Sequence, residues 1–118
     1  MGENNFSREL RLLTPTHFQH VFSDAIPAVS PHLTLLARKN ELTYPRLGIT
    51  VSKKNVKHAV ERNRIKRIIR ESFRHHQHNL PTIDIIAIGK RGIAQLDNQQ
   101  LFSVLEKQWI KLIKRCDT

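Results

Sequence analysis

The feature that most constrains the fold is a change of apolar period in the middle of the chain. Between residues 46 and 52, the sequence RLGITVS places an apolar side chain at every second position, which is typical of a half-buried strand. Between about residues 56 and 77, apolar side chains recur at helical spacing instead, and Asn55 is a candidate N-cap for that helix. The stripe that we expect to pack on a sheet is formed by Ile65, Ile68, Ile69, Ser72 and Phe73.

Further elements are predicted on both sides of this strand and helix. Thr14-Pro15 is a typical helix start, with Thr14 as the N-cap and Pro15 at the first helical position. The other predicted elements are an extended edge segment around Ala28, strands at residues 32–38 and 83–88, and a last helix capped by Asp97. The order α-β-β-β-α-β-α predicts an α+β sandwich, a single domain spanning residues 1–118 in which residues 1–9 are a loose polar arm.

The positive charge of the chain is concentrated in one segment. The sequence has 20 Lys and Arg against 10 Asp and Glu, which gives a formal net charge of +10. Residues 46–75 hold ten of the basic side chains and only two acids, Glu61 and Glu71, so this segment alone carries +8. A surplus that only served solubility would be spread more evenly, so the concentration indicates a polyanionic partner.

Most of this charge falls on the central helix, opposite its apolar stripe. The residues on that side are Asn63, Lys66, Arg67, Arg70 and Arg74, with Arg62 and Arg64 at its two edges. We call Lys66, Arg67, Arg70 and Arg74 the cationic ridge. Like charges at this density destabilise a helix, and a phosphate backbone would neutralise them. The ridge therefore predicts nucleic-acid binding rather than a merely solvated face, without choosing RNA over DNA.

Several classes of protein are excluded by the composition. Cys116 is the only cysteine, so a disulfide scaffold, a zinc ribbon and a paired redox site within the chain are excluded. No apolar run approaches the roughly 18 residues that a membrane-spanning helix needs. Residues 1–10 do not have the pattern of a secretory signal. We therefore expect a cytoplasmic protein that does not bind a membrane.

The sequence contains no pattern typical of a protein active site. Its acids are scattered, and neither a glycine-rich phosphate loop nor an HExxH motif is present, so we expect no catalytic residues and no small-molecule substrate. His75, His76 and His78 lack a fourth zinc ligand, and the favourable effect of positive charge at a helix end explains them. Asp84, in the fourth strand, is expected to be structural, with a magnesium ligand as the alternative. We therefore predict no metal site in this chain.

Two long motifs follow one another in the centre of the chain. RLGITVSKK occupies residues 46–54, and AVERNRIKRIIRESFR occupies residues 59–74 with Arg-Asn-Arg at residues 62–64. Together they resemble the bacterial ribonuclease P protein subunit, whose signature has the same Arg-Asn-Arg core. The resemblance begins at Thr14-Pro15, continues through the strand at 83–88 and reaches the last helix. It therefore covers nearly the whole chain, in the order of elements predicted above.

The resemblance implies a ribonucleoprotein function. In that family a large RNA is the catalyst, and it removes the 5′ leader from precursor tRNA by metal-assisted hydrolysis of a phosphodiester bond. The implied partners are the ribonuclease P RNA subunit and precursor tRNA, and the implied cofactor is the Mg²⁺ that the RNA–protein holoenzyme uses. The implied fold is ribosomal protein S5 domain 2-like, with a left-handed β-α-β crossover around the basic helix instead of the usual right-handed one.

The resemblance also implies roles for particular residues. The implied RNA-binding residues are Arg62, Asn63, Arg64, Lys66, Arg67, Arg70, Lys53 and Lys54. The leader of precursor tRNA would lie in a cleft between the first helix and the sheet, lined by Phe18, Phe22 and Thr50. Without the resemblance, Phe18 and Phe22 at i, i+4 spacing are most simply core residues, so packing and stacking on RNA are both open.

Two positions depart from the family pattern. Leu36 or a neighbour stands where some relatives have a tyrosine in the cleft, so we expect weaker base stacking or apolar contact there. Residues 55–58 stand where some relatives have a shorter, glycine-containing connection, so we expect the entry to the helix to differ. Two other functions fit a basic α+β chain: a ribosomal or assembly protein that binds ribosomal RNA, and an independent nuclease.

Overall fold

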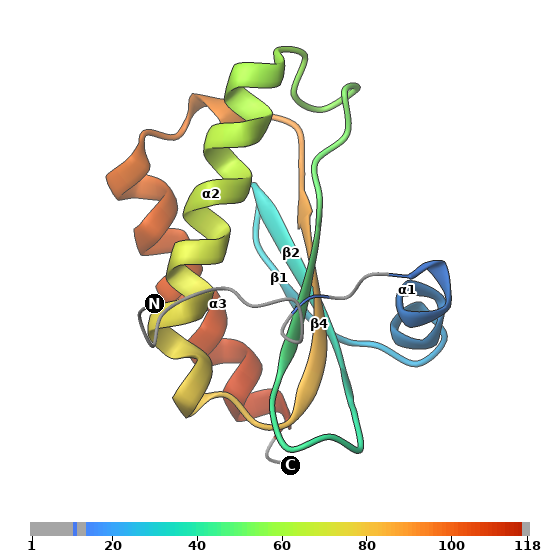
Figure 1. Cartoon of the computed structure of the whole chain (residues 1–118). Helices are drawn as coiled ribbons and strands as arrows, with labels where there is room; N and C mark the ends of the chain where they lie inside the picture. Colours follow the sequence, from blue (N-terminus) through green and yellow to red (C-terminus); the bar gives the residue numbers. More distant parts are fainter. Residues whose placement is uncertain (1–10, 12–13, 117–118) are drawn as a thin grey trace, which may run out of the picture.

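The structure is an α+β sandwich with the predicted order of elements (Figure 1). The computed structural model describes residue 11 and residues 14–116, and the predicted polar arm at residues 1–9 lies outside them. The helices are α1 (Pro15–Phe22), α2 (Ala59–His76) and α3 (Asn98–Cys116), with short 3₁₀ turns η2 (Gln77–Asn79) and η3 (Ile93–Gln95). The strands are β1 (Ile26–Val29), β2 (Leu33–Lys39), β3 (Arg46–Thr50) and β4 (Ile83–Gly89). None of the described helices is long and apolar enough to cross a lipid bilayer.

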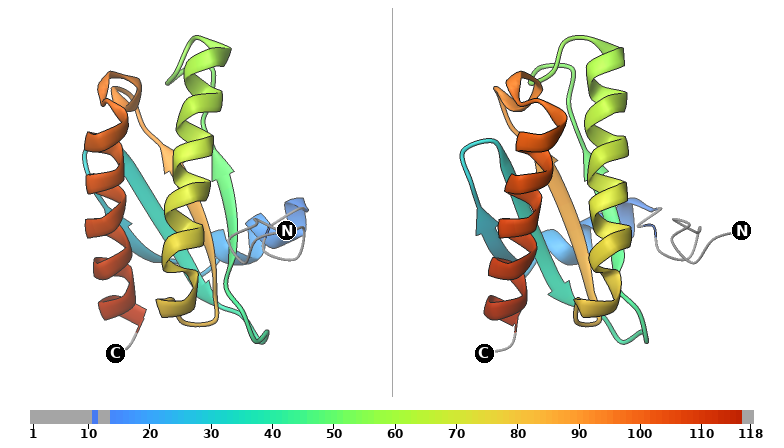
Figure 2. Two further views of the ribbon diagram at one scale, coloured as in Figure 1. Left: turned by 60° about the vertical axis from the view of Figure 1, so that its left-hand side comes forward. Right: turned by 90° about the vertical axis from the view of Figure 1, so that its left-hand side faces the viewer.

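The four strands form one mixed sheet in the order β1-β2-β4-β3. β2 pairs antiparallel with β1 and with β4, whereas β3 pairs parallel with β4 and places Arg46 opposite Asp84. Seen from the helical side, the chain leaves β3, passes through α2 and returns in β4 to the left of β3 (Figure 2, right). The crossover is therefore left-handed, as the resemblance implied and against the usual preference.

The two faces of the sheet are covered unequally (Figures 1 and 2). α2 and α3 cover one face, and the main core lies between them and the alternate strand residues that point that way, among them Leu35, Leu47 and Ile85. α1 packs on the other face, over a small second cluster in which Val21 and Ile86 are buried. Among the described residues, no helix other than α1 covers that side of the sheet.

The apolar stripe of the central helix is confirmed, because all five of its predicted residues are buried. Its one polar member, Ser72, accepts a hydrogen bond of 2.8 Å from Nε1 of Trp109 in α3. A buried indole needs a hydrogen-bond acceptor, and the serine hydroxyl supplies it at the contact between the two helices.

Two of the predicted helix caps are confirmed. The hydroxyl of Thr14 accepts a hydrogen bond of 3.2 Å from the backbone N–H of His17 at the start of α1. Before α3, Asp97 Oδ1 accepts from the N–H of Gln100 at 2.8 Å, and Gln100 Oε1 accepts from the N–H of Asp97 at 2.9 Å. This reciprocal pair is a capping box, which fixes where α3 begins.

The predicted start of the central helix is wrong. α2 begins at Ala59, and the residue before it, His58, makes no side-chain cap. Val56 is only 2% exposed, but it enters the core from an irregular loop rather than from a helical turn. Asn55 is not the N-cap, because its side-chain amide donates to the carbonyl of Gly89 at the end of β4, at 3.1 Å. The loop before α2 is therefore anchored to the sheet instead of extending the helix.

Candidate nucleic-acid interface

The cationic ridge lies on the outward side of α2. Arg67 and Arg70 are exposed, and Lys66 and Arg74 are half-buried. Within the described part of the chain, the side chains of Lys66, Arg67 and Arg70 have no hydrogen-bond or ion-pair partner, whereas Arg74 lies 4.0 Å from Glu71. Because the core beneath α2 fixes the helix, these positive charges have a set spacing and are available to an anionic partner.

Arg62, the first residue of the signature, is turned toward the loop that precedes α2. Its Nη1 donates to the carbonyl oxygens of Val56 and Lys57, each at 2.9 Å. The side chain is half-buried by these contacts. In the free chain, the guanidinium of Arg62 therefore has internal partners at a position for which the resemblance implied contact with RNA.

Arg64 is turned to the opposite side, toward the start of α3. It donates to Glu61 Oε2 at 2.9 Å, to Asn98 Oδ1 at 2.9 Å and to the carbonyl of Ala94 at 3.1 Å. Asn63 lies between the two arginines and is exposed, and its side chain has no partner among the described residues. Two of the three signature residues are thus engaged within the molecule, and one faces outward without such bonds.

Lys53 and Lys54 lie in the loop that joins β3 to α2, at the N-terminal end of that helix (Figure 1). Both side chains are exposed, as is that of Lys57 in the same loop. The structure thus places three lysines of the loop next to the end of the helix that carries the ridge. Together they make the N-terminal end of α2 strongly positive.

The aromatic residues of α1 are divided between packing and exposure. Phe18 is half-buried and packs on the second cluster, whereas Phe22 is 52% exposed. Both border an apolar hollow whose other lining residues are Thr14, Pro15 and Gln19. The hollow is therefore formed by α1 and its N-cap, and the strands of the sheet do not line it.

Thr50, the third predicted cleft residue, lies elsewhere on the same side of the molecule. It is exposed at the end of β3 and lies opposite Ile88 of β4, which packs on the second cluster. Strand alternation directs Thr50 away from the main core, to the face of the sheet on which α1 lies. The structure thus brings Phe18 and Phe22 together and leaves Thr50 outside their hollow.

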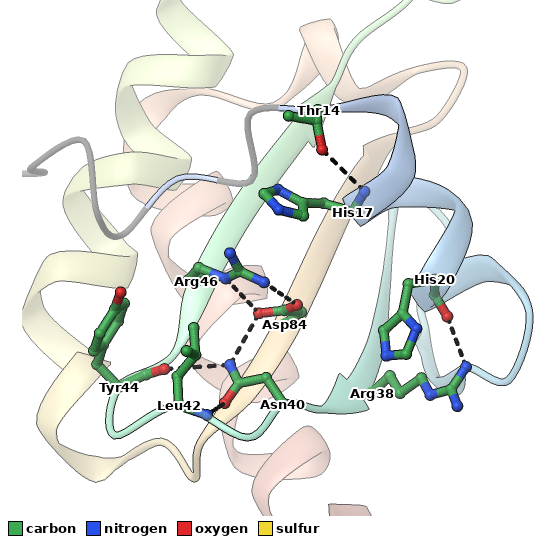
Figure 3. Close-up of polar contacts among 9 residues, drawn as sticks. All are labelled: Thr14, His17, His20, Arg38, Asn40, Leu42, Tyr44, Arg46 and Asp84. Atoms are coloured by element: carbon green, nitrogen blue, oxygen red, sulfur yellow. Dashed lines mark hydrogen bonds and ion pairs between the residues drawn. The ribbon is translucent and has the colours of Figure 1, made fainter.

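Arg38 in β2 anchors the end of α1 to the sheet (Figure 3). Its Nη1 donates to the carbonyl of His20 at 2.9 Å and to the hydroxyl of Ser23 at 2.7 Å. A cation at the carbonyl end of a helix is favourable because the last carbonyls carry partial negative charge. Arg38 therefore helps to fix the position of the helix that carries Phe18 and Phe22.

A second arginine on this face forms an ion pair with Asp84 (Figure 3). Arg46 of β3 donates from Nε to Oδ1 at 2.9 Å and from Nη2 to Oδ2 at 2.7 Å. The amide of Asn40 donates to the same Oδ1 at 2.9 Å, and Asp84 is only 1% exposed. These hydrogen bonds from Arg46 to Asp84 raise the pKa of the guanidinium above its usual value. The pair fixes β3 to β4 on the side of the sheet that faces α1.

The acidic, histidine and cysteine side chains of the described part of the chain are not gathered into a cluster. No group of three or more His, Cys, Asp or Glu side chains in this part could hold a metal ion. Both oxygens of Asp84 are held by Arg46 and Asn40, which supports the structural role predicted for this residue. His76 lies with Nδ1 2.9 Å from the carbonyl of Ser72 and with Nε2 3.7 Å from Glu106.

The sequence did not indicate the positioning residues of the α1 side. The sequence patterns assign no site role to Arg38, place Asn40 only in a turn between strands, and mark Arg46 only as one charge of the basic segment. Side chains alternate between the two faces of a strand, so Arg46 and Asp84 fall on the face opposite to Leu47 and Ile85 of the main core. This alternation could have indicated that Arg46 and Asp84 share a face. Their pairing depends on the parallel register of strands 38 residues apart, which no local pattern gives.

The fold and its charged surface define a class of protein. A small mixed sheet has two long helices on one face, a left-handed crossover and a ridge of lysine and arginine on the crossover helix. This is a small basic α+β protein with fixed positive charge along one helix, an arrangement typical of proteins that bind polyanions.

Comparison with known proteins places the chain within this class. The sequence model of the family Ribonuclease P matches residues 6–113. The ribonuclease P protein component of Pseudoalteromonas atlantica is 68% identical over 99% of this chain and 98% of its own length. That of Haemophilus influenzae is 56% identical over 97% of this chain and 96% of its own length. The chain belongs to the ribonuclease P protein family, which supplies the protein component of a tRNA-processing enzyme.

Solved structures of more distant relatives have the same fold. The RNase P protein of Staphylococcus aureus superposes with a TM-score of 0.82 at 32% identity, covering 90% of this chain and 96% of that one. The RNase P protein of Thermotoga maritima superposes with a TM-score of 0.72 at 30% identity, covering 89% and 96% respectively. The α+β architecture predicted from the sequence is confirmed by these neighbours.

Proposed function

We propose that this chain binds the ribonuclease P RNA through the cationic ridge and the lysines of the β3–α2 loop. The observation that carries the proposal is the ridge itself, in which Lys66, Arg67 and Arg70 have no partner in the described part of the chain. Each phosphate that such a side chain neutralises releases counterions, which drives association with RNA at moderate salt. Exposed Asn63 is suited to a hydrogen bond with the RNA beside these charges.

The second part of the proposal concerns precursor tRNA. The hollow beside Phe18 and Phe22 is apolar and open, and aromatic side chains of this kind stack on unpaired bases. We assign this hollow to the single-stranded 5′ leader, with Thr50 as a polar contact further along the same face. Binding of the leader there would distinguish precursor tRNA from mature tRNA.

The third part assigns the chemistry to the RNA subunit. Among the described residues the only buried carboxylate is that of Asp84, which is committed to Arg46 and Asn40. Hydrolysis assisted by Mg²⁺ needs converging carboxylates or phosphates to hold the metal, and RNA phosphates can supply them. The protein would then neutralise phosphate repulsion around the catalytic site, lower the Mg²⁺ requirement and raise the affinity for substrate. Its place of action would be the cytoplasm.

A reconstitution assay tests this division of labour. Precursor tRNA would be incubated at low Mg²⁺ with the chain alone, with a bacterial ribonuclease P RNA alone, and with both. We expect cleavage at the mature 5′ end only in the mixture. Cleavage by the chain alone would place the active site in the protein. RNA binding without any effect on cleavage would favour a ribosomal RNA partner instead.

The leader assignment predicts a selective effect at Phe22. Phe22→Ala is expected to weaken holoenzyme binding of precursor tRNA on the order of tenfold, because one stacking contact is lost. Binding of mature tRNA, which has no leader, should be unchanged. The measurement is the ratio of the two dissociation constants, and the free energy of unfolding should change by less than about 1 kcal/mol because the ring is half exposed.

A matched control comes from the other face of the molecule. Ile110 in α3 is 54% exposed, close to the exposed fraction of Phe22. Ile110→Ala should leave both dissociation constants unchanged. An equal loss of affinity for precursor and mature tRNA in the Phe22 variant would contradict a leader contact at the hollow.

A further inference from the structure

The two hydrogen bonds of Arg62 hold the loop that carries Lys53, Lys54 and Lys57. The carbonyls that accept from its Nη1 belong to Val56 and to Lys57 itself, so the bonds fix the backbone of that lysine directly. Hydrogen bonds from a charged donor to carbonyls are stronger than those between neutral groups. Arg62 therefore connects the first turn of α2 to the loop before it.

Other contacts fix the remaining parts of the same loop. The side chain of Val56 is buried in the main core, and the amide of Asn55 donates to the carbonyl of Gly89 at 3.1 Å. The carbonyl of Ser52 accepts from the N–H of Asn55 at 3.2 Å and from that of Val56 at 2.9 Å, which closes a turn around the lysines. Asn55 and Val56 attach the loop to the sheet and core, and Arg62 attaches it to α2.

Arg62 bonds to the loop before α2, and the arginines of the ridge do not. The side chain of Arg67, one and a half turns further along α2, is exposed and has no partner in the described part of the chain. A guanidinium that turned from the loop carbonyls to a phosphate would leave the loop held only by its attachments to the sheet and core. The favourable free energy of the phosphate contact would then be offset, because the three lysines would become more mobile and more conformational entropy would be lost when they bind RNA.

We infer that Arg62 is a positioning residue, which orders the loop so that Lys53, Lys54 and Lys57 meet the RNA in a fixed arrangement. This inference rests on the proposed function, since it takes the loop lysines to be part of the RNA interface. An ordered loop binds more tightly than a mobile one because less conformational entropy is lost on binding. Arg62 thus contributes to RNA affinity through the lysines.

The first test uses the free chain and trypsin, which cleaves after lysine and arginine, and follows cleavage at lysine sites that are present in every variant. Arg62→Ala is expected to speed cleavage after Lys53, Lys54 and Lys57 by about tenfold, because local opening of the loop becomes easier. Cleavage after Lys107 in α3 reports global unfolding and should keep its rate. Arg67→Ala is the matched control and should change neither rate. Unchanged cleavage of the loop in the Arg62 variant would overturn the positioning role.

The second test is a double-mutant cycle in RNA binding. Arg62→Ala is made in the native chain and in a chain whose three loop lysines are alanine, and the dissociation constant for a bacterial ribonuclease P RNA is measured for each. We expect a loss of about tenfold in the native background and of less than about twofold without the lysines, because coupled groups are not additive. Arg67→Ala should cost the same factor in both backgrounds.

Two further outcomes separate the inference from the proposed function. An equal loss for Arg62→Ala in both backgrounds, with the slope of log K against log salt reduced by about one, would identify a direct phosphate contact and overturn the positioning role. Faster trypsin cleavage with unchanged RNA affinity would instead remove the loop from the proposed RNA interface. The positioning of the loop by Arg62 within the protein would then stand without the RNA function.

Discussion

Replacing Lys66, Arg67 and Arg70 together with alanine is expected to weaken binding of ribonuclease P RNA on the order of 100-fold at physiological salt. Three phosphate contacts disappear, so the slope of log K against log salt should become less steep by about 2 to 3. The fold should be retained, because the buried side of α2 is untouched and like-charge repulsion along the helix decreases. The measurement is a salt titration of RNA affinity for the native chain and the variant.

A variant with the same loss of net charge provides the control. Arg91, Lys107 and Lys114 are exposed and lie outside the segment that carries most of the charge. Their replacement by alanine should lower RNA affinity only through the weaker long-range field, and the slope should change by less than about one. Equal effects of the two triple variants would mean that net charge, rather than the ridge, governs binding.

Arg46→Met is expected to lower the free energy of unfolding by about 3 to 4 kcal/mol, because it leaves the buried carboxylate of Asp84 without its charged partner. Methionine keeps the apolar stem of the side chain as far as the position of Nε, so most of the effect comes from the lost ion pair. The measurement is denaturant unfolding of the two chains, with Arg91→Met as an exposed control that should change the free energy by less than about 0.5 kcal/mol. A loss of that small size in the Arg46 variant would mean that the ion pair does not stabilise the fold.

The pH dependence of this difference follows from the raised pKa of Arg46. A base whose pKa is raised on folding stabilises the native state at pH values below its unfolded pKa, and this stabilisation is lost as the pH rises through its folded pKa. Between about pH 7 and 9 the guanidinium is fully charged in both states. The titration of Arg46 should therefore add no pH dependence, over that range, to the difference in free energy of unfolding between the native chain and Arg46→Met.

The local patterns of the sequence predicted the elements of this fold well. Alternation at residues 46–52 and the stripe from Ile65 to Phe73 describe side chains that meet one continuous core, so periodicity reports them directly. The caps at Thr14 and Asp97 involve atoms only three residues apart, which a local motif also captures. The left-handed crossover came only from the resemblance, because neither spacing nor composition determines handedness.

The failures and omissions concern partners that lie far apart in the sequence. Asn55 has the properties of an N-cap, but its amide bonds to Gly89, 34 residues away, and the helix begins later. The resemblance implied an RNA-binding role for Arg64, and no local pattern showed that in the free chain its side chain bonds to residues 30 and 34 positions away. A charge pattern indicates which residues can bind phosphate, and only the fold indicates which of them are already engaged.

The uneven cover of the sheet sets how the molecule can partly open. α1 has eight residues, too few for a stable isolated helix, and it is attached through Val21, Phe18 and the bonds from Arg38. α2, by contrast, is fixed by five buried residues on the main core. Detachment of α1 is therefore a local event that costs less than global unfolding. The hollow beside Phe18 and Phe22, which we propose binds the leader, can therefore move to fit leaders of different shape while the cationic ridge keeps its geometry.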